Sequence, residues 1–117
     1  MLRTVLLIAG DACANTAAHV SFKFSALRTR GASASGRRVR GFVAWQIAGN
    51  GAAFLGVLAY TAILRGMSLH VAYPLTEGLS AVGVQLAGVM LILRERISAR
   101  AWAGTCLIVC GIVCFSL

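Results

Sequence analysis

Acidic residues, lysine and proline are the scarcest features of this 117-residue chain. It contains three acidic residues (Asp11, Glu77 and Glu95), one lysine (Lys23) and one proline (Pro74), and 12% of its residues are charged against 59% that are hydrophobic. Soluble domains carry about 25% charged residues, so this composition argues against a soluble protein. Nucleotide-binding and metalloprotease motifs are also missing from the sequence, and we expect neither an enzyme nor a bound cofactor.

The four cysteines do not indicate a metal site. Three of them, Cys106, Cys110 and Cys114, recur every four residues in the last apolar run and therefore share one helical face. No histidine or carboxylate accompanies them in that run, and a disulfide between two of them within one helix is sterically poor. We interpret them as small packing residues of an apolar helix, and no metal ion is expected.

Arginine supplies nearly all of the positive charge, and the formal net charge is +8. Such a charge can indicate nucleic-acid binding, but here the basic residues lie between apolar runs rather than among aromatic side chains. That arrangement is typical of cytoplasmic loops beside anionic lipid headgroups. Membrane lipids are therefore expected partners, and nucleic acid is not.

Four apolar runs divide the chain, at about residues 2–25, 41–64, 68–93 and 99–117. A membrane-spanning helix needs about 20 mostly apolar residues, so the runs predict an all-α, four-helix transmembrane bundle in a single domain, residues 1–117. Pro74 lies inside the third run and predicts a kink or break near Tyr73. Ser98 is the expected N-cap of the fourth helix.

Basic residues are distributed unequally between the two sides of this predicted bundle. Loops 26–40 and 94–100 share one side, whereas both termini and the turn at residues 65–66 share the other. The first side carries eight arginines, namely Arg28, Arg30, Arg37, Arg38, Arg40, Arg94, Arg96 and Arg100. The second carries Arg3 and Arg65. Because basic loops stay in the cytoplasm, we expect a multi-pass protein of the bacterial inner membrane with periplasmic termini.

Polar side chains lie along one face of the first predicted helix, at Asp11, Asn15, His19 and Lys23. Residues four apart lie nearly above one another on a helix, and each step turns by about 40°. Polar groups at membrane depth are costly and usually face a bundle interior or a water-filled cavity, so all four are candidate substrate-binding residues. Structural roles are the alternatives: a snorkelling anchor for Lys23, a backbone hydrogen bond for His19, and an ion pair for Asp11.

The third apolar run contributes two further candidates beside its proline. Glu77 follows Pro74 by about one turn, and a carboxylate embedded in a membrane is a functional candidate because its burial is costly. Tyr73 offers an aromatic face and a hydroxyl group to a cavity. The alternatives are an ion pair that fixes assembly for Glu77 and ordinary helix packing for Tyr73.

Several short motifs follow one another along the chain. They are NTAAHVSFK at residues 15–23, AYPL at 72–75, RERIS at 94–98, and the tryptophan, glycine and aliphatic residues of 102–113. Their order and spacing resemble the small, four-helix branch of the drug/metabolite transporter superfamily (EamA-like, small multidrug resistance-like), and the resemblance covers nearly the whole chain. It implies a transporter in which two repeats of opposite orientation form a site near the membrane midplane.

Two groups within this branch differ at one position of the first helix. The proton-coupled multidrug exporters carry a glutamate eight residues before the lysine, where this chain has Asn15, which cannot titrate. The subunits that flip aminoarabinose-linked undecaprenyl phosphate lack that glutamate and keep both the lysine and the AYP sequence. This chain is most similar to the flippase subunits, although its residues 76–78, TEG, depart from both groups.

The resemblance implies a flippase subunit that moves a polyprenyl-phosphate-linked (amino)sugar across the membrane. Lys23 and loop arginines would meet the phosphate, while Glu77, Asn15 and Asp11 would meet the headgroup. The charge bias favours one orientation, so the expected partner is a separate, oppositely oriented homologue, with a homodimer as the alternative. The alternative functions are a proton-coupled exporter of small cationic compounds, which would need Asp11 or Glu77 to titrate, and a non-transporting membrane scaffold.

Overall fold

The fold is that of a computed structural model, which describes residues 1–29, 36–92, 94 and 96–116. The helical segments of this part are α1 (Leu2–Thr29), α2 (Gly36–Leu64), α3 (Leu69–Gly83), the π-helix η1 (Val84–Ile92) and α4 (Ala99–Ser116). The described part of the chain contains no strand, so the all-α class and the four helices are confirmed.

The first two helices are longer than the sequence predicted. α1 continues past residue 25 to Thr29, and α2 begins at Gly36 instead of residue 41. Arginine has good helix propensity, and the side chain of Arg28 lies over Gly41, where an added Cβ atom would come within 3.1 Å of its Nη1 atom. The two helix ends therefore pack on each other beyond their apolar segments, and the described parts of the expected loop 26–40 are largely helical.

The third apolar run changes its helical geometry, but not at its proline. α3 runs through Tyr73 and Pro74 without a break, because Pro74 lies close to the helix start and only the first turn has to adjust to its ring. The α-helix gives way instead to a π-helix at Val84. π-Helical turns are rare and are frequently found at functional sites, so the change directs attention to the residues around Val84.

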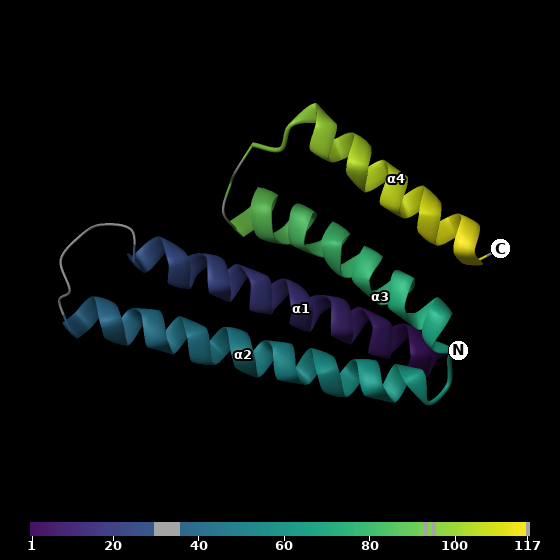
Figure 1. Cartoon of the computed structure of the whole chain (residues 1–117), viewed down its shortest axis with the longest axis horizontal. Coiled ribbons are helices and arrows are strands. Elements are labelled where there is room, and N and C mark those ends of the chain that lie inside the picture. The colour runs from purple at the N-terminus through teal and green to yellow at the C-terminus, as the bar shows by residue number, and fades with distance from the viewer. Residues whose placement is uncertain (30–35, 93, 95, 117) are drawn as a thin grey trace.

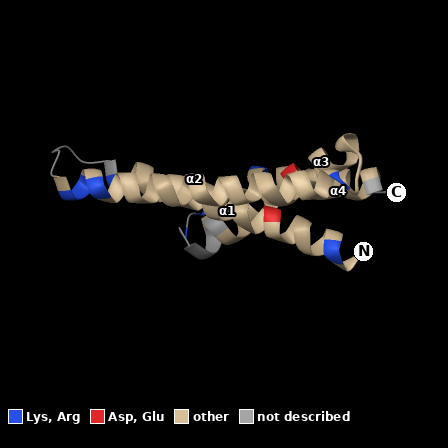
Figure 2. Cartoon of the chain, turned by 90° about the horizontal axis from the view of Figure 1, so that it is seen from below, with Lys and Arg blue, Asp and Glu red and all other residues tan. Residues whose placement is uncertain are grey.

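The helices lie side by side in the order α2, α1, α3, α4 (Figure 1). Consecutive helices of the chain run in opposite directions, so the neighbours α1 and α3 are parallel to each other. α1 packs against both α2 and α3, and α4 packs on α3. When the molecule is turned, the N-terminal part of α1 slopes away from α2 (Figure 2). The predicted bundle is therefore an open, curved layer rather than a closed ring of helices around one core.

The two ends of this layer differ in charge and in the chain segments they hold. Both termini lie at one end, and the start of α2 lies at the other (Figure 1). Basic residues gather at the start of α2, as the blue part of the ribbon in Figure 2 shows, and they include Arg37, Arg38 and Arg40. The alternation of helix direction thus places both termini away from this basic cluster, as the order of the apolar runs predicted.

A glycine and three aromatic side chains hold α1 and α2 together. Gly49 of α2 is buried, and an added Cβ atom there would lie 2.6 Å from Cε1 of Phe22 on α1. Nearby, the rings of Phe24 and Trp45 stack with their centroids 5.0 Å apart. Small residues allow helix backbones to approach closely in this way, so the sequence position of Gly49 sets the distance between the two helices.

Two glycines of α3 have the same effect on its neighbours. An added Cβ atom at Gly83 would lie 2.8 Å from Oγ1 of Thr16 on α1, and one at Gly78 would lie 2.7 Å from Cδ1 of Ile112 on α4. At the start of α4, the backbone N–H of Ala101 donates to Oγ of Ser98 at 3.3 Å. The predicted N-cap at Ser98 is therefore confirmed.

Large apolar side chains cover much of the outer surface. Five examples, each more than half exposed, are Leu6, Phe54, Leu55, Val113 and Phe115. Within the described residues, Leu2–Arg28 and Gly36–Leu64 are long and apolar enough to cross a membrane, and Ala99–Phe115 is a shorter apolar helix. An apolar exterior and sparse buried core agree with a hydrocarbon surrounding better than with water.

Candidate functional site

A groove of about 630 Å³ opens along one face of α3 and η1, between α1 and the start of α4. Volumes of about 300–1,000 Å³ are typical of small-molecule sites, and this groove is the candidate functional site. Its polar lining residues come from α1, α3, η1 and the segment before α4, and they are His19, Glu77, Ser80, Gln85, Arg96 and Ser98. Val84, Val89 and Ile97 supply apolar surface between them.

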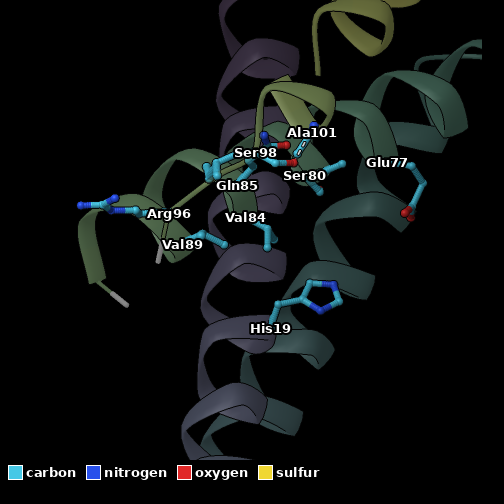
Figure 3. A pocket seen from close by; sticks show the side chains of 11 residues that line it. His19, Glu77, Ser80, Val84, Gln85, Val89, Arg96, Ser98 and Ala101 are labelled. Atoms are coloured by element: carbon cyan, nitrogen blue, oxygen red, sulfur yellow. Dashed lines mark hydrogen bonds between the residues drawn. The ribbon is translucent and has the colours of Figure 1, made fainter. Parts of the chain in front are cut away.

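Two ionisable side chains from different helices flank the groove. His19 of α1 and Glu77 of α3 are both exposed, and both extend toward the same side of the groove (Figure 3). A carboxylate accepts hydrogen bonds from ammonium or hydroxyl groups, and an imidazole can donate or accept one. This side of the groove is therefore suited to a ligand with amino or hydroxyl groups, and the fold brings together two residues that the sequence singled out separately.

The wall between α3 and α4 holds two polar groups of a different kind. Ser80 is only 6% exposed, and the Nε2 atom of Gln85 is buried as well; among the described residues neither Ser80 Oγ nor Gln85 Nε2 has a hydrogen-bond partner. The other side-chain atom of Gln85, Oε1, accepts a hydrogen bond from the hydroxyl of Thr105 on α4. Buried polar groups without a partner are destabilising and rare. These two atoms therefore indicate that this wall has a role beyond helix packing.

The charged groups of the groove are separated along its length. Arg96 lies at the end remote from Glu77, and its side chain is directed away from that residue (Figure 3). Ser98 stands between them, where its Oγ caps α4. A guanidinium at one end and a carboxylate at the other give the groove a polarity that suits a ligand with an anionic and a cationic or hydroxyl-bearing part.

The polar stripe of α1 does not act as a single lining. Asn15 donates to Oδ1 of Asp11 at 3.1 Å, and Asp11 is only 2% exposed. Asn15 faces α2, where an added Cβ atom at Gly56 would lie 3.4 Å from its side-chain amide. His19 opens into the groove instead. Because each four-residue step turns by about 40°, the stripe winds around the helix and divides between two neighbours.

Two other predicted residues lie elsewhere. Lys23 is half-buried and Tyr73 is 58% exposed, and neither lines the groove. The cation that does line it is Arg96, one of the loop arginines. Glu95, between the two arginines of the same motif, lies outside the described residues. The structure thus selects His19 and Glu77 from the predicted set as the groove-lining members.

Sequence reasoning missed Ser80 and Gln85. Residues five apart lie about 140° apart around an α-helix, so their spacing gives no reason to place them on one face. One signal was available, since Gln85 is the single polar residue in the otherwise apolar stretch VQLAGVMLI. An amide in such surroundings needs a partner, and Thr105 accounts for only one of its two polar atoms.

A second groove, of about 710 Å³, shares no lining residue with the first. It lies between other faces of α1 and α3 and is lined mainly by small or apolar side chains, such as Ala12, Val20, Phe24 and Leu79. Ser21, which is 8% exposed, is one of its few polar lining residues. This groove offers little polar chemistry, so we assign the functional role to the first.

Comparisons of the chain with protein-family models, with curated proteins and with solved structures give no match. Its function is therefore inferred from the geometry and chemistry of the groove.

Proposed function

We propose that this chain is one subunit of a flippase in the bacterial inner membrane, which moves a polyprenyl-phosphate-linked (amino)sugar or a related lipid-linked substrate across the bilayer. The observation that carries the proposal is the laterally open groove, with His19, Glu77, Ser80 and Gln85 on its walls and Arg96 at one end. Polar residues in a membrane are expensive and face a substrate path or a partner. The order of the sequence motifs supports the same assignment.

An open layer suits a substrate that is itself a membrane lipid. Apolar side chains cover the outside of the helices, so the polyprenyl tail can stay in the hydrocarbon while the polar headgroup occupies the groove. The phosphate would pair with Arg96, because a guanidinium binds phosphate oxygens in a bidentate way. An amino or hydroxyl group of the sugar would bind Glu77, with His19 beside it.

A second subunit completes the proposed transporter. Glu77 and His19 are exposed in the single chain, and an exposed carboxylate among apolar side chains is stable in a bilayer only when another polar surface covers it. We propose an oppositely oriented homologue as that partner, with a homodimer as the alternative. Transporters built from two such repeats bind their substrates at the repeat interface.

Orientation is tested with reporters fused to the C-terminus of the full chain. We expect alkaline phosphatase, which is active only in the periplasm, to be active, and a cytoplasmic fluorescent protein to be dark, because eight arginines belong to the other side of the predicted bundle and two to this one. Comparable activity of both reporters would instead show dual topology and would favour a homodimer.

Transport is tested with proteoliposomes. The chain is purified in mild detergent together with any subunit that stays bound, and is reconstituted with a fluorescent polyprenyl phosphoryl sugar whose outer-leaflet population is quenched chemically. We expect faster loss of the protected inner population than in protein-free liposomes. Equal rates with and without protein would contradict the flippase assignment.

One observation favours the second candidate function, a proton-coupled exporter of small cationic compounds. Asp11 is only 2% exposed within α1, and a carboxylate embedded in a membrane helix is a candidate carrier of a coupling proton. An exporter would bind tetraphenylphosphonium, and the binding would weaken as the pH falls because protonation removes the negative charge. Absence of tetraphenylphosphonium binding at any pH would contradict the exporter.

A further inference from the structure

The region where α3 becomes η1 contains buried polar atoms that form no hydrogen bond with any described residue. Ser80 Oγ lies on the last full turns of α3, and Gln85 Nε2 lies at the start of η1. Both residues line the polar groove, and Ser80 is 94% buried, since 6% of it is exposed. A buried polar group is normally paired, so two unpaired ones at one place indicate a ligand.

The fold, and not their spacing along the helix, brings these two residues to one groove. In a continuous α-helix Gln85 would lie about 140° around the axis from Ser80, and only the last step between them lies in the π-helix that begins at Val84. Both residues nevertheless line the groove. The Oε1 atom of Gln85 accepts a hydrogen bond from Thr105 of α4, and this hydrogen bond holds the orientation of the side chain.

The atoms that remain define the chemistry of the ligand. With Oε1 occupied by Thr105, Gln85 presents the N–H groups of Nε2, which can only donate, and Ser80 presents a hydroxyl that can donate or accept. Neither side chain is charged. An oxygen that accepts from Gln85 while exchanging a hydrogen bond with Ser80 fits this pair, and a neutral hydroxyl group has those properties. Phosphate and ammonium groups are better matched to Arg96 and Glu77.

We propose that Ser80 and Gln85 form a subsite that binds a sugar hydroxyl of the lipid-linked substrate and so distinguishes a glycosylated polyprenyl phosphate from the bare lipid phosphate. This inference rests on the proposed flippase function and names the part of the substrate that this wall recognises. Sites built to hydrogen-bond a hydroxyl reject ligands without it, because their buried polar groups then stay unpaired. Thr105 positions Gln85 without touching the ligand.

The test measures dissociation constants for the protein, with any bound partner subunit, in lipid nanodiscs. Two probes are used, a polyprenyl phosphate and the same lipid carrying glucose on its phosphate. We expect the wild type to bind the glycosylated probe more tightly, and Ser80→Ala and Gln85→Met each to weaken that probe about tenfold, the usual effect of losing one buried hydrogen bond. Affinity for the bare polyprenyl phosphate should not change.

Two controls separate this result from damage to the fold. Ser21→Ala makes the same substitution at a similarly buried position of the other groove and should change neither affinity. Ser80→Ala leaves the hydrogen bond between Gln85 and Thr105 intact. This variant therefore tests the subsite by itself if Gln85→Met unfolds the protein. Equal affinities of wild type and Ser80→Ala for the glycosylated probe, or equal losses for both probes, would overturn the subsite alone. A wild type that binds neither probe would overturn the flippase as well.

Discussion

Replacing Glu77 by Gln is expected to lower the translocation rate of a lipid-linked aminosugar by about 10- to 100-fold. Glu77 lines the polar groove beside His19, and in the proposed function it pairs with an amino or hydroxyl group of the substrate. Hydrogen bonds to a charged group contribute about 1.5–3 kcal/mol, and about 1.4 kcal/mol corresponds to a factor of ten. Glutamine keeps the size and shape of the side chain, so the loss reports on the charge.

The proteoliposome assay checks this expectation, and the chain offers a matched control. Glu95→Gln makes the same change between two arginines of the sequence RER, and its translocation rate should stay within about twofold of the wild type. Using a neutral hydroxylated headgroup in place of an aminosugar should shrink the effect of Glu77→Gln, because no ion pair is lost. Wild-type rates for Glu77→Gln with both headgroups would remove Glu77 from the mechanism.

Replacing Gly49 by Leu is expected to destabilise the pairing of α1 and α2 by about 3 kcal/mol. An added Cβ atom would already lie 2.6 Å from Cε1 and 2.8 Å from Cδ1 of Phe22, so the new side chain must displace the ring. Overpacking of this kind costs about 1–3 kcal/mol, and the displaced ring lies close to the stacked pair of Phe24 and Trp45. Thermal unfolding in detergent should show a Tm lowered by at least about 5 °C.

Gly51→Leu is the control for this substitution. Gly51 lies two positions further along α2, and no atom of a neighbouring residue lies within 4 Å of an added Cβ atom there. The control should keep the wild-type Tm, and replacing an exposed helical glycine can even raise it slightly. Equal Tm values for the two variants would mean that α1 and α2 do not approach each other at Gly49.

The helices could largely be predicted from the sequence because their determinants are local. Long apolar runs and scarce charge placed the four helices within a few residues of their observed bounds, and Ser98 has the short polar side chain that an N-cap requires. Two features escaped this reasoning. Helix continues into the basic segments at Thr29 and Gly36, where the side chain of Arg28 lies over Gly41 of the next helix. The π-helix begins at Val84, directly after Gly83, where α3 approaches Thr16 of α1.

The candidate site could be predicted only in part, for a geometric reason. A polar side chain in an apolar helix can be recognised in the sequence, so His19 and Glu77 were found. Their meeting could not be recognised, because it depends on how α1 and α3 cross at Gly83 and Thr16. Asn15 has the same periodic spacing as His19, yet it bonds to Asp11 and faces α2.

The sequence by itself determined which parts of this chain are helical, how apolar their surfaces are, and on which side the arginines gather, since each of these is a property of neighbouring residues. The tertiary structure decided that the helices form an open layer, and that Ser80 and Gln85 share one wall of a groove with His19 and Glu77. The spacing of residues along one helix specifies the direction in which each side chain leaves the helix axis. A binding site also depends on the distance between the axes of neighbouring helices. That distance is set where Gly49, Gly78 and Gly83 admit side chains from the neighbouring helices.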